Sequence, residues 1–264
     1  MANMKKWICL AAAVLLAFSL AACGGAGTGS DSSASGGAGK TYVIYSDNAF
    51  PPYEFLDNAT NTYVGIDMDI LAAVAKDQNF QYEVKNEGFD ASMGAVQAGQ
   101  ADGMIAGMTI TDERKQTFDF SEPYFEDGQI LVVKGDSSVQ SLEDLKGKRI
   151  AVKTSTQGAA YAESVKDEYD LELVYYEDSP TMYTAIENGT DDACFEDRMV
   201  ILYTIGSENL NLKTVGDVIN PGSYGFAVKK GTNAALLEMF NKGLANIRAS
   251  GEYDEILAKY NYQP

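Results

Sequence analysis

Apolar and polar residues alternate in a regular order through the first part of the folded chain. One face of "GIDMDILAAVAKDQN" (65–79) repeats apolar residues at helical spacing, at Ile66, Ile70, Leu71 and Val74, which predicts a half-buried helix. The predicted elements are strand, helix, strand, helix and strand over 41–46, 65–79, 81–87, 89–99 and 101–108. Strands that alternate with helices indicate an α/β domain with a mainly parallel sheet.

A second unit of the same kind begins near Gln129. Its predicted strands cover 129–134, 148–153, 171–176 and 191–197, and its predicted helices cover 141–147, 155–169, 179–189 and 198–208. The chain then returns with a predicted strand over 224–230 and finishes in predicted helices over 233–249 and 252–260. Ser141 and Asp144 have the spacing of a capping box, and Ser179 followed by Pro180 is typical of a helix start. The pattern therefore predicts two α/β units.

Two segments that lie 90 positions apart share one form, "VQAGQADGMIAG" (96–107) and "IENGTDDACFED" (186–197). In each, a helix ends at glycine, and a short apolar strand follows and stops at small or polar residues. Open α/β sheets bind ligands at the carboxyl ends of their strands. The repetition therefore predicts two similar lobes whose strand ends face a shared cleft.

The segment "IAGMTITDERKQTFDF" (105–120) leaves the apolar interior at Gly107 and then places four charges together. One interpretation is structural, with Thr111 capping a surface helix and the charges facing water. The other is functional, with the guanidinium of Arg114 binding an anion at the strand end. The local pattern alone leaves both open.

The N-terminal residues differ in character from the rest. Lys5 and Lys6 precede an apolar run that is short for a membrane span, which is typical of a signal peptide over 1–22. The residues "LAAC" resemble a lipobox, which implies cleavage before Cys23 and lipid attachment to its thiol. The alternative is an ordinary secretory signal cut near Ala22, with Cys23 left as a free thiol.

Residues 23–40 then combine the predicted lipidated cysteine with a stretch of Gly, Ser and Ala. Such a stretch buries little apolar surface and predicts a flexible tether with an r.m.s. reach of about 20–25 Å. We expect a protein anchored by lipid on the outer face of the cell membrane.

Composition excludes several classes of function. The formal net charge of −18 becomes −20 once Lys5 and Lys6 are removed, so nucleic acid and anionic lipid headgroups are repelled. The sequence has no histidine, which removes His-based triads and His metal sites. Cys194 lies in an apolar run and is expected to be a core residue without a disulfide. We expect no metal and no cofactor.

Five motifs together resemble those of a known family. They are "DNAFPPYEF" (47–55), "VGIDMDILAAVA" (64–75), "GMTITDERKQTFDFSEPYF" (107–125), "SLEDLKGKRIAVKTSTQG" (141–158) and "ENGTDDACFED" (187–197). In this order, across residues 41–262, they resemble the solute-binding proteins of polar amino acid ABC transporters (bacterial extracellular solute-binding protein family 3). The resemblance is greatest to the glutamine-binding type.

The resemblance implies a periplasmic-binding-protein-like α/β fold, with two α/β lobes joined by a two-strand hinge and a ligand cleft between them. Lobe 1 would comprise 41–124 plus 225–264, and lobe 2 would comprise 129–219. The hinge would lie near 124–128 and 220–224.

An α-amino acid offers a carboxylate, an ammonium and a side chain to such a cleft. For the carboxylate, Arg114 supplies a bidentate fork, Gly107 permits close approach of the backbone, and Thr109 can donate a hydroxyl. Ala106 belongs to the same expected contact set. These residue types together predict a carboxylate clamp.

Correspondence with the family adds three contacts from the second lobe. It places Thr156 and Gln157 where free helix amides could meet the carboxylate, although plain capping by Ser155 or Thr156 is the structural alternative. It also matches Asp197 to the acceptor of the ligand's ammonium.

The family positions for the ligand's side chain fall on aromatic and charged residues. Phe50 and Phe89 match rings that sandwich the aliphatic part, Asp47 matches an acidic contact, and Lys153 matches a lysine at the pocket edge. Glu196 is less typical and either points away or helps to recognise the side chain. An acceptor and a donor together suit a carboxamide.

We therefore expect a monomeric, non-enzymatic receptor that binds a free polar L-amino acid and delivers it to an ABC transporter permease. Glutamine is the first choice, and arginine or lysine is the second. The alternative from another class is an enzyme similar to cyclohexadienyl dehydratase, with Asp47, Glu54, Glu196 and Asp197 as acid–base groups. A third interpretation is the sensor lobe of a membrane kinase or channel.

Overall fold

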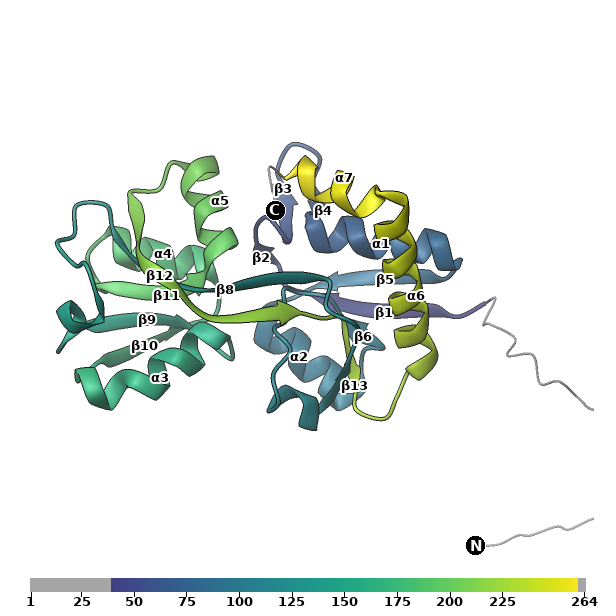
Figure 1. The fold of residues 1–264 in the computed structure, drawn as a ribbon, viewed down its shortest axis with the longest axis horizontal. Coiled ribbons are helices and arrows are strands. Elements are labelled where there is room, and N and C mark those ends of the chain that lie inside the picture. The colour runs from purple at the N-terminus through teal and green to yellow at the C-terminus, as the bar shows by residue number, and fades with distance from the viewer. Residues whose placement is uncertain (1–38, 261–264) are drawn as a thin grey trace, which may run out of the picture. The chain divides into compact units, whose positions relative to one another are not determined.

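The computed structural model describes residues 39–260, whose strands form two five-stranded sheets and one three-stranded sheet (Figure 1). The predicted signal peptide, Cys23 and most of the predicted tether lie outside the described residues. Between residues 39 and 260, no helix combines the length and the apolar character that crossing a bilayer requires.

The first sheet has the strand order β5-β1-β6-β13-β7. Its strands are β1 (Thr41–Ser46), β5 (Gln81–Asn86), β6 (Gly103–Met104), β7 (Phe118–Phe120) and β13 (Ala227–Lys229). β1 pairs in parallel with β5 and β6, whereas β13 pairs antiparallel with β6 and β7. The accompanying helices are α1 (Ile66–Gln78), α2 (Phe89–Ala98), α6 (Ala234–Ser250) and α7 (Glu252–Lys259). α6 and α7 pack against α1 (Figure 1).

The second sheet has the order β10-β9-β11-β8-β12. Its strands are β8 (Phe125–Lys134), β9 (Arg149–Lys153), β10 (Glu172–Tyr176), β11 (Ala193–Asp197) and β12 (Leu212–Tyr224). The helical segments are η2 (Leu142–Leu145), α3 (Gln157–Tyr169), α4 (Ser179–Glu187) and α5 (Arg198–Glu208). β9 pairs in parallel with β10 and β11, and β8 is antiparallel to both β11 and β12.

The two sheets repeat one topology, which confirms the internal repetition seen in the sequence. In each sheet three parallel strands (β5-β1-β6 and β10-β9-β11) are followed by an antiparallel fourth. β6 and β11 occupy equivalent places, and each follows a helix whose end is marked by a glycine with positive φ, Gly99 or Gly189. The predicted fold class of two α/β lobes is therefore correct.

Two long strands connect the sheets. β8 and β12 pair from Phe125↔Tyr224 at one end to Lys134↔Leu212 at the other, with irregular register between Val215 and Gly222. The chain passes from the first sheet to the second along β8 and returns along β12 (Figure 1). The predicted hinge segments, 124–128 and 220–224, lie where these strands meet the first sheet. Their role as a hinge, and the bounds of the lobes, stay predictions.

The resemblance implied a crossing strand only near 220–224, whereas β12 begins at Leu212, and the strand predicted over 224–230 is instead the end of β12 followed by the short β13. The sequence of β12 hides it, because Gly216 and Asn220 have positive φ and Pro221 cannot donate to a ladder. Antiparallel pairing with β8 makes this segment a strand. The expected irregular segment after β1 contains a small sheet of β2 (Ala49–Phe50), β3 (Glu54–Asp57) and β4 (Thr62–Val64).

The predicted caps are partly right. Ser141 and Asp144 form the expected capping box. Ser179 is not the cap of α4, because Asp178 accepts the hydrogen bond from Thr181 N at 2.8 Å, and aspartate is an equally good cap. The hydroxyl of Ser179 is thereby free to donate elsewhere, to the carboxylate of Glu196.

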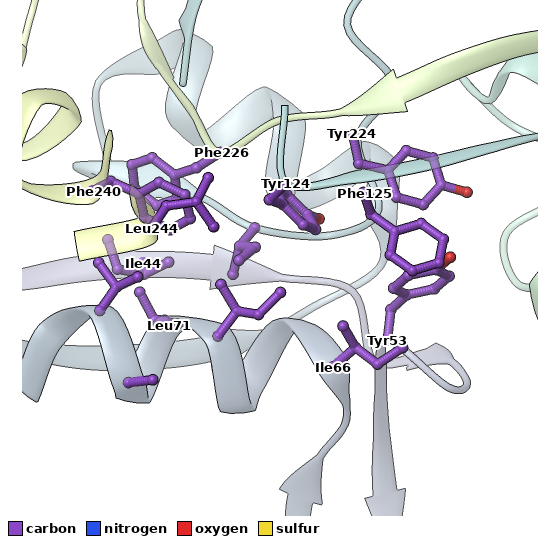
Figure 2. Close-up of a cluster of buried hydrophobic side chains, with 14 of the residues drawn as sticks. Ile44, Tyr53, Ile66, Leu71, Tyr124, Phe125, Tyr224, Phe226, Phe240 and Leu244 are labelled. Atoms are coloured by element: carbon purple, nitrogen blue, oxygen red, sulfur yellow. The ribbon is translucent and has the colours of Figure 1, made fainter. Parts of the chain in front are cut away.

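The largest apolar cluster joins the first lobe to the connecting strands (Figure 2). The ring centres of Tyr53 and Phe125 lie 5.2 Å apart. The rings of Phe125 and Tyr224 are stacked, with 6.0 Å between their centres. Val200 of α5 is buried in the same cluster, so the second lobe contributes to this core. Full burial of each such side chain stabilises the fold by about 1.5–3 kcal/mol. Cys194 is buried in the second lobe, as expected.

Candidate functional site

Arg114 begins the short 3₁₀ helix η1 (Arg114–Gln116), whose first turn is closed by Thr111 Oγ1 accepting from Arg114 N at 3.1 Å. The side chains of Asp112 and Lys115 are 99% and 54% exposed, whereas Arg114 is only 8% exposed. The structural interpretation of this segment is thus partly right, and the binding of an anion by Arg114 stays a prediction. Thr111 does close a turn and the neighbouring charges face water, but the arginine points inward.

The guanidinium of Arg114 spans the two lobes. Nη1 donates to Thr109 O at 2.8 Å in the first lobe, and Nη2 donates to Ser155 O at 2.9 Å in the second. Burial lowers the pKa of Arg114 to about 10, and the charge of Asp197 opposes that shift. Arg114 therefore stays charged at neutral pH and lies close enough to Asp197 to interact with it electrostatically.

Gly107 lies three residues after β6, which is shorter than the strand predicted over 101–108, and has φ of +53°. A Cβ at this position would lie 2.6 Å from Cε1 of Phe50, so both the backbone conformation and the space require glycine. Gly107 N donates to Asp67 Oδ2 at 2.8 Å. The neighbouring Ala106 is buried, and Thr109 forms a backbone bridge to Tyr224.

Asp197 ends β11 and is 7% exposed. Its Oδ1 accepts from Tyr224 OH at 2.7 Å and from Gln129 Nε2 at 2.9 Å. Burial and the charge of Asp127 raise the pKa of Asp197 to about 6. Neither Arg114 nor Asp197 has an oppositely charged atom within 4.0 Å among residues 39–260.

Lys153 and Asp47 form a buried ion pair between the lobes. The ammonium of Lys153 also lies 4.8 Å from the ring centre of Phe50 and 5.9 Å from that of Phe89, while Arg114 lies 5.4 Å from Phe89. Burial lowers the pKa of Lys153, but the carboxylates of Asp47 and Glu196 outweigh it, and the net shift is upward. The two phenyl rings are therefore bordered by two fixed cations.

Glu196 is held inside the second lobe. Its Oε2 accepts from Ser179 Oγ at 2.9 Å and from Tyr183 OH at 2.7 Å, and its Oε1 accepts from Asp197 N at 2.9 Å. Burial and the charge of Asp197 raise its pKa. With three donors from its own lobe, Glu196 supports the end of β11.

Thr156 caps the start of α3, as the structural alternative for this segment predicted. Thr156 Oγ1 accepts from Ala159 N at 3.3 Å and donates to Lys153 O at 2.8 Å, and Gln157 is the first helical residue. Ser155 was not predicted as important, but its Oγ donates to Asp90 of the first lobe. The two predicted lobes are therefore in direct contact at Ser155, Lys153 and Arg114.

The structure thus brings together Asp47, Phe50, Phe89, Arg114, Lys153 and Asp197, and it places Ala106, Gly107, Thr109, Thr156 and Gln157 on segments next to them. Sequence reasoning missed Tyr224 and Gln129, which support Asp197, and Ser155. Tyr224 was taken only as the start of a strand. No local motif marks Tyr224 and Gln129, because their contacts with Asp197 depend on the pairing of β8 with β12 and β11.

Comparison with known proteins gives consistent matches along the chain. A probable histidine-binding protein of Neisseria gonorrhoeae is 37% identical over 262 residues, covering 98% of this chain and 96% of that protein. The ABC transporter glutamine-binding protein GlnH of Bacillus subtilis is 37% identical over 201 residues, covering 74% and 72%. Among solved structures, an ancestral arginine-binding protein bound to arginine is 38% identical, covers 83% and 97%, and has a TM-score of 0.78.

The family of bacterial extracellular solute-binding proteins, family 3, matches residues 42–263, which is nearly the whole described chain. This match agrees with the repeated sheet topology and with the relatives named above. The chain therefore belongs to the bacterial extracellular solute-binding proteins of family 3.

Proposed function

We propose that this protein binds a free L-amino acid between its lobes, with Arg114 holding the carboxylate and Asp197 holding the ammonium. One observation carries the proposal. A buried guanidinium and a buried carboxylate interact across the two lobes without forming a direct ion pair, and unpaired buried charges are costly. A zwitterion supplies an opposite charge to each. The segment from Ala106 to Thr109 and the start of α3 at Thr156 and Gln157 would border its carboxylate.

The same chemistry favours glutamine over arginine or lysine. The ammonium of Lys153 already lies over Phe50 and Phe89, so a cationic side chain there would be repelled. The two acids that could offset this repulsion are engaged, Asp47 with Lys153 and Glu196 with its three donors. A carboxamide carries no charge that Lys153 would repel, and its oxygen can accept from Lys153. The relatives' names differ in ligand, histidine, glutamine and arginine, so they support the class of amino acids and leave the choice to the site.

The remaining parts of the proposal concern delivery. Relatives that serve ABC transporters support transfer of the ligand to a membrane permease. A lipid on Cys23 and a tether over 23–40 would keep the protein at the outer face of the membrane. We propose a monomer, because the amino acid contacts come from the two lobes of one chain.

An enzyme of the dehydratase type finds less support. Three of the acids that it would use are committed to other tasks: Asp47 pairs with Lys153, Glu196 accepts three hydrogen bonds, and Glu54 lies at 0% exposure. General acid–base catalysis requires a group within reach of the substrate proton. Incubation of the purified protein with amino acids and analysis for product separates the two functions.

Thermal shift with each of the twenty amino acids, followed by calorimetry, tests the proposal. A ligand that binds only the folded state raises the melting temperature, and micromolar to nanomolar affinity corresponds to about 8–12 kcal/mol. We expect the largest shift with L-glutamine. Absence of a shift with every amino acid would overturn the proposed function.

A further inference from the structure

Two buried carboxyl groups outside the predicted contact set lie near each other and near the Ala106–Gly107 peptide. Asp67 N donates to the carbonyl of Tyr53, the residue before Glu54, at 3.0 Å, and Asp67 Oδ2 accepts from Gly107 N at 2.8 Å. Glu54 begins β3 and Asp67 lies in the first turn of α1, and both are 0% exposed. Within residues 39–260, no donor reaches either oxygen of Glu54 or Oδ1 of Asp67. Buried polar atoms without partners are rare and call for a physical reason.

A shared proton supplies that reason. Two ionised carboxylates side by side in an apolar site repel each other and lose hydration, so one of them takes up a proton. Once protonated, the pair makes the hydrogen bond that two acceptors cannot make. Nearby Lys153 is paired with Asp47, and among the described residues no cluster of three His, Cys, Asp or Glu could hold a metal ion instead.

The hydrogen bonds decide which carboxyl carries the proton. Asp67 Oδ2 accepts from Gly107 N at 2.8 Å and from Tyr124 OH at 2.7 Å, and such donors stabilise the ionised form. Glu54 receives no donor of this kind. In agreement, burial and the charge of Asp67 raise the pKa of Glu54 well above its usual range, whereas burial raises that of Asp67 only to about 6, because the donors oppose the shift.

Asp67 is connected through these bonds to the predicted contact set. Because a peptide N–H and C=O point in opposite directions, the bond from Gly107 N turns the carbonyl of Ala106 away from Asp67. The other donor, Tyr124, immediately precedes β8, and its own N donates to Tyr224 O at 2.9 Å. Asp67 therefore fixes the Ala106–Gly107 peptide relative to the strands that connect the lobes.

We propose that Glu54 and Asp67 share one proton, and that Asp67 is a positioning residue that holds the Ala106–Gly107 peptide in its binding orientation. The second part rests on the proposed function, since it concerns affinity for the amino acid. The first part does not, because the proton is present in the ligand-free protein. Glu54 acts through Asp67 and need not touch the ligand.

The shared proton makes stability depend on pH. The charged and titratable groups that face the pair are Asp47 and Lys153 toward Glu54, and Tyr53 and Tyr124 toward Asp67. The folded state binds the proton more tightly than the unfolded chain. The stability that it contributes is therefore fully present below the unfolded pKa of a glutamate and is lost as pH rises through the raised folded pKa.

Glu54→Gln tests the proton directly, because its carboxamide can donate to Asp67 as a protonated glutamate does. We expect Glu54→Gln to bind L-glutamine within about threefold of the wild type. In ligand-free thermal melts between pH 5 and 8, we expect its melting temperature to decline less with pH than that of the wild type. Asp67→Asn, which removes the charged acceptor, is expected to weaken binding about tenfold or more.

Asp69→Asn is the matched control on the same helix. Asp69 accepts from Lys259 Nζ at 2.7 Å and from Tyr260 OH at 2.9 Å, away from the binding segment. This variant should lower stability without changing affinity. The proposal is overturned if Glu54→Gln loses affinity as Asp67→Asn does, if its pH slope equals that of the wild type, or if Asp69→Asn weakens binding equally. A wild type that binds no amino acid defeats the proposed function, while the ligand-free melts still decide the shared proton.

Discussion

The segments that follow the equivalent strands β6 and β11 of the two lobes differ in charge. After β6, the first lobe presents the uncharged residues Ala106 and Gly107. The cation of this segment is Arg114, in the turn that follows. After the last apolar residues of β11, the strand itself ends in two carboxylates, Glu196 and Asp197. The same topology thus places an uncharged segment followed by a cation in the first lobe and two acidic residues in the second lobe.

Two lobes of the same topology therefore carry opposite charges near their equivalent strand ends. A zwitterion placed between the lobes would meet positive charge from the first lobe and negative charge from the second. Each charge also has support within the frame, Thr109 O and Ser155 O for Arg114 and Tyr224 OH and Gln129 for Asp197. The orientation of the ligand would follow from this asymmetry.

Substitution of Arg114 should reduce the affinity for the amino acid more than any other change. Arg114→Ala should weaken binding of L-glutamine about 1,000-fold or more, because the ligand's carboxylate would be left buried without a partner. Arg114→Lys should recover only part of the loss, since a lysine lacks the bidentate fork. Calorimetry measures both. Lys115→Ala, one residue away on an exposed side chain, is the control and should bind like the wild type.

At the opposite strand end, Asp197→Asn should weaken binding about 100-fold. The amide keeps the shape and can still accept from Tyr224, but it no longer offsets the ligand's ammonium. Asp192→Asn, which lies just before β11 and contacts Lys148, serves as the control in the same titration. An Asp197→Asn variant with wild-type affinity would remove the second lobe from the proposed site.

Lys153 is expected to affect which amino acid side chain the protein prefers. Removing its charge in Lys153→Met should reduce the preference for glutamine over arginine about tenfold, because the repulsion of a cationic side chain disappears. The ratio of the two dissociation constants is the readout. Lys166→Met changes an exposed lysine paired with Glu163 and should leave that ratio unchanged. A ratio unaffected in Lys153→Met would contradict the role given to Lys153.

The pKa of Asp197 gives the smallest effect. At about 6 in the ligand-free protein, it means that below pH 6 the ligand must displace a proton, so affinity should fall about tenfold per pH unit. Stability of the ligand-free protein changes in the opposite direction. The contribution of Asp197 is present below the unfolded pKa of an aspartate and is lost as pH rises through about 6. Titrations from pH 5 to 8 test the first statement, and thermal melts test the second.

The sequence was most informative where structure depends on local pattern. The α/β order could be predicted from periodicity, and the turn after Gly107 marked Arg114 as a candidate, although the local pattern also allowed a solvated surface helix. Most of β12 could not be predicted, because a strand broken by Gly216 and Pro221 is determined by its partner β8. The Glu54–Asp67 pair also escaped prediction, since only the fold brings residues 54 and 67 together near Gly107.

A cycle of two proteins and two ligands decides whether Arg114 holds the carboxylate of the amino acid. The wild type and Arg114→Ala are each titrated with L-glutamine and with its α-amide, in which the carboxylate has become a neutral carboxamide. We predict that the wild type discriminates against the amide by about 100-fold or more, and that Arg114→Ala binds both ligands weakly and almost equally. If Arg114→Ala keeps the full discrimination, the carboxylate is held elsewhere and the account is wrong.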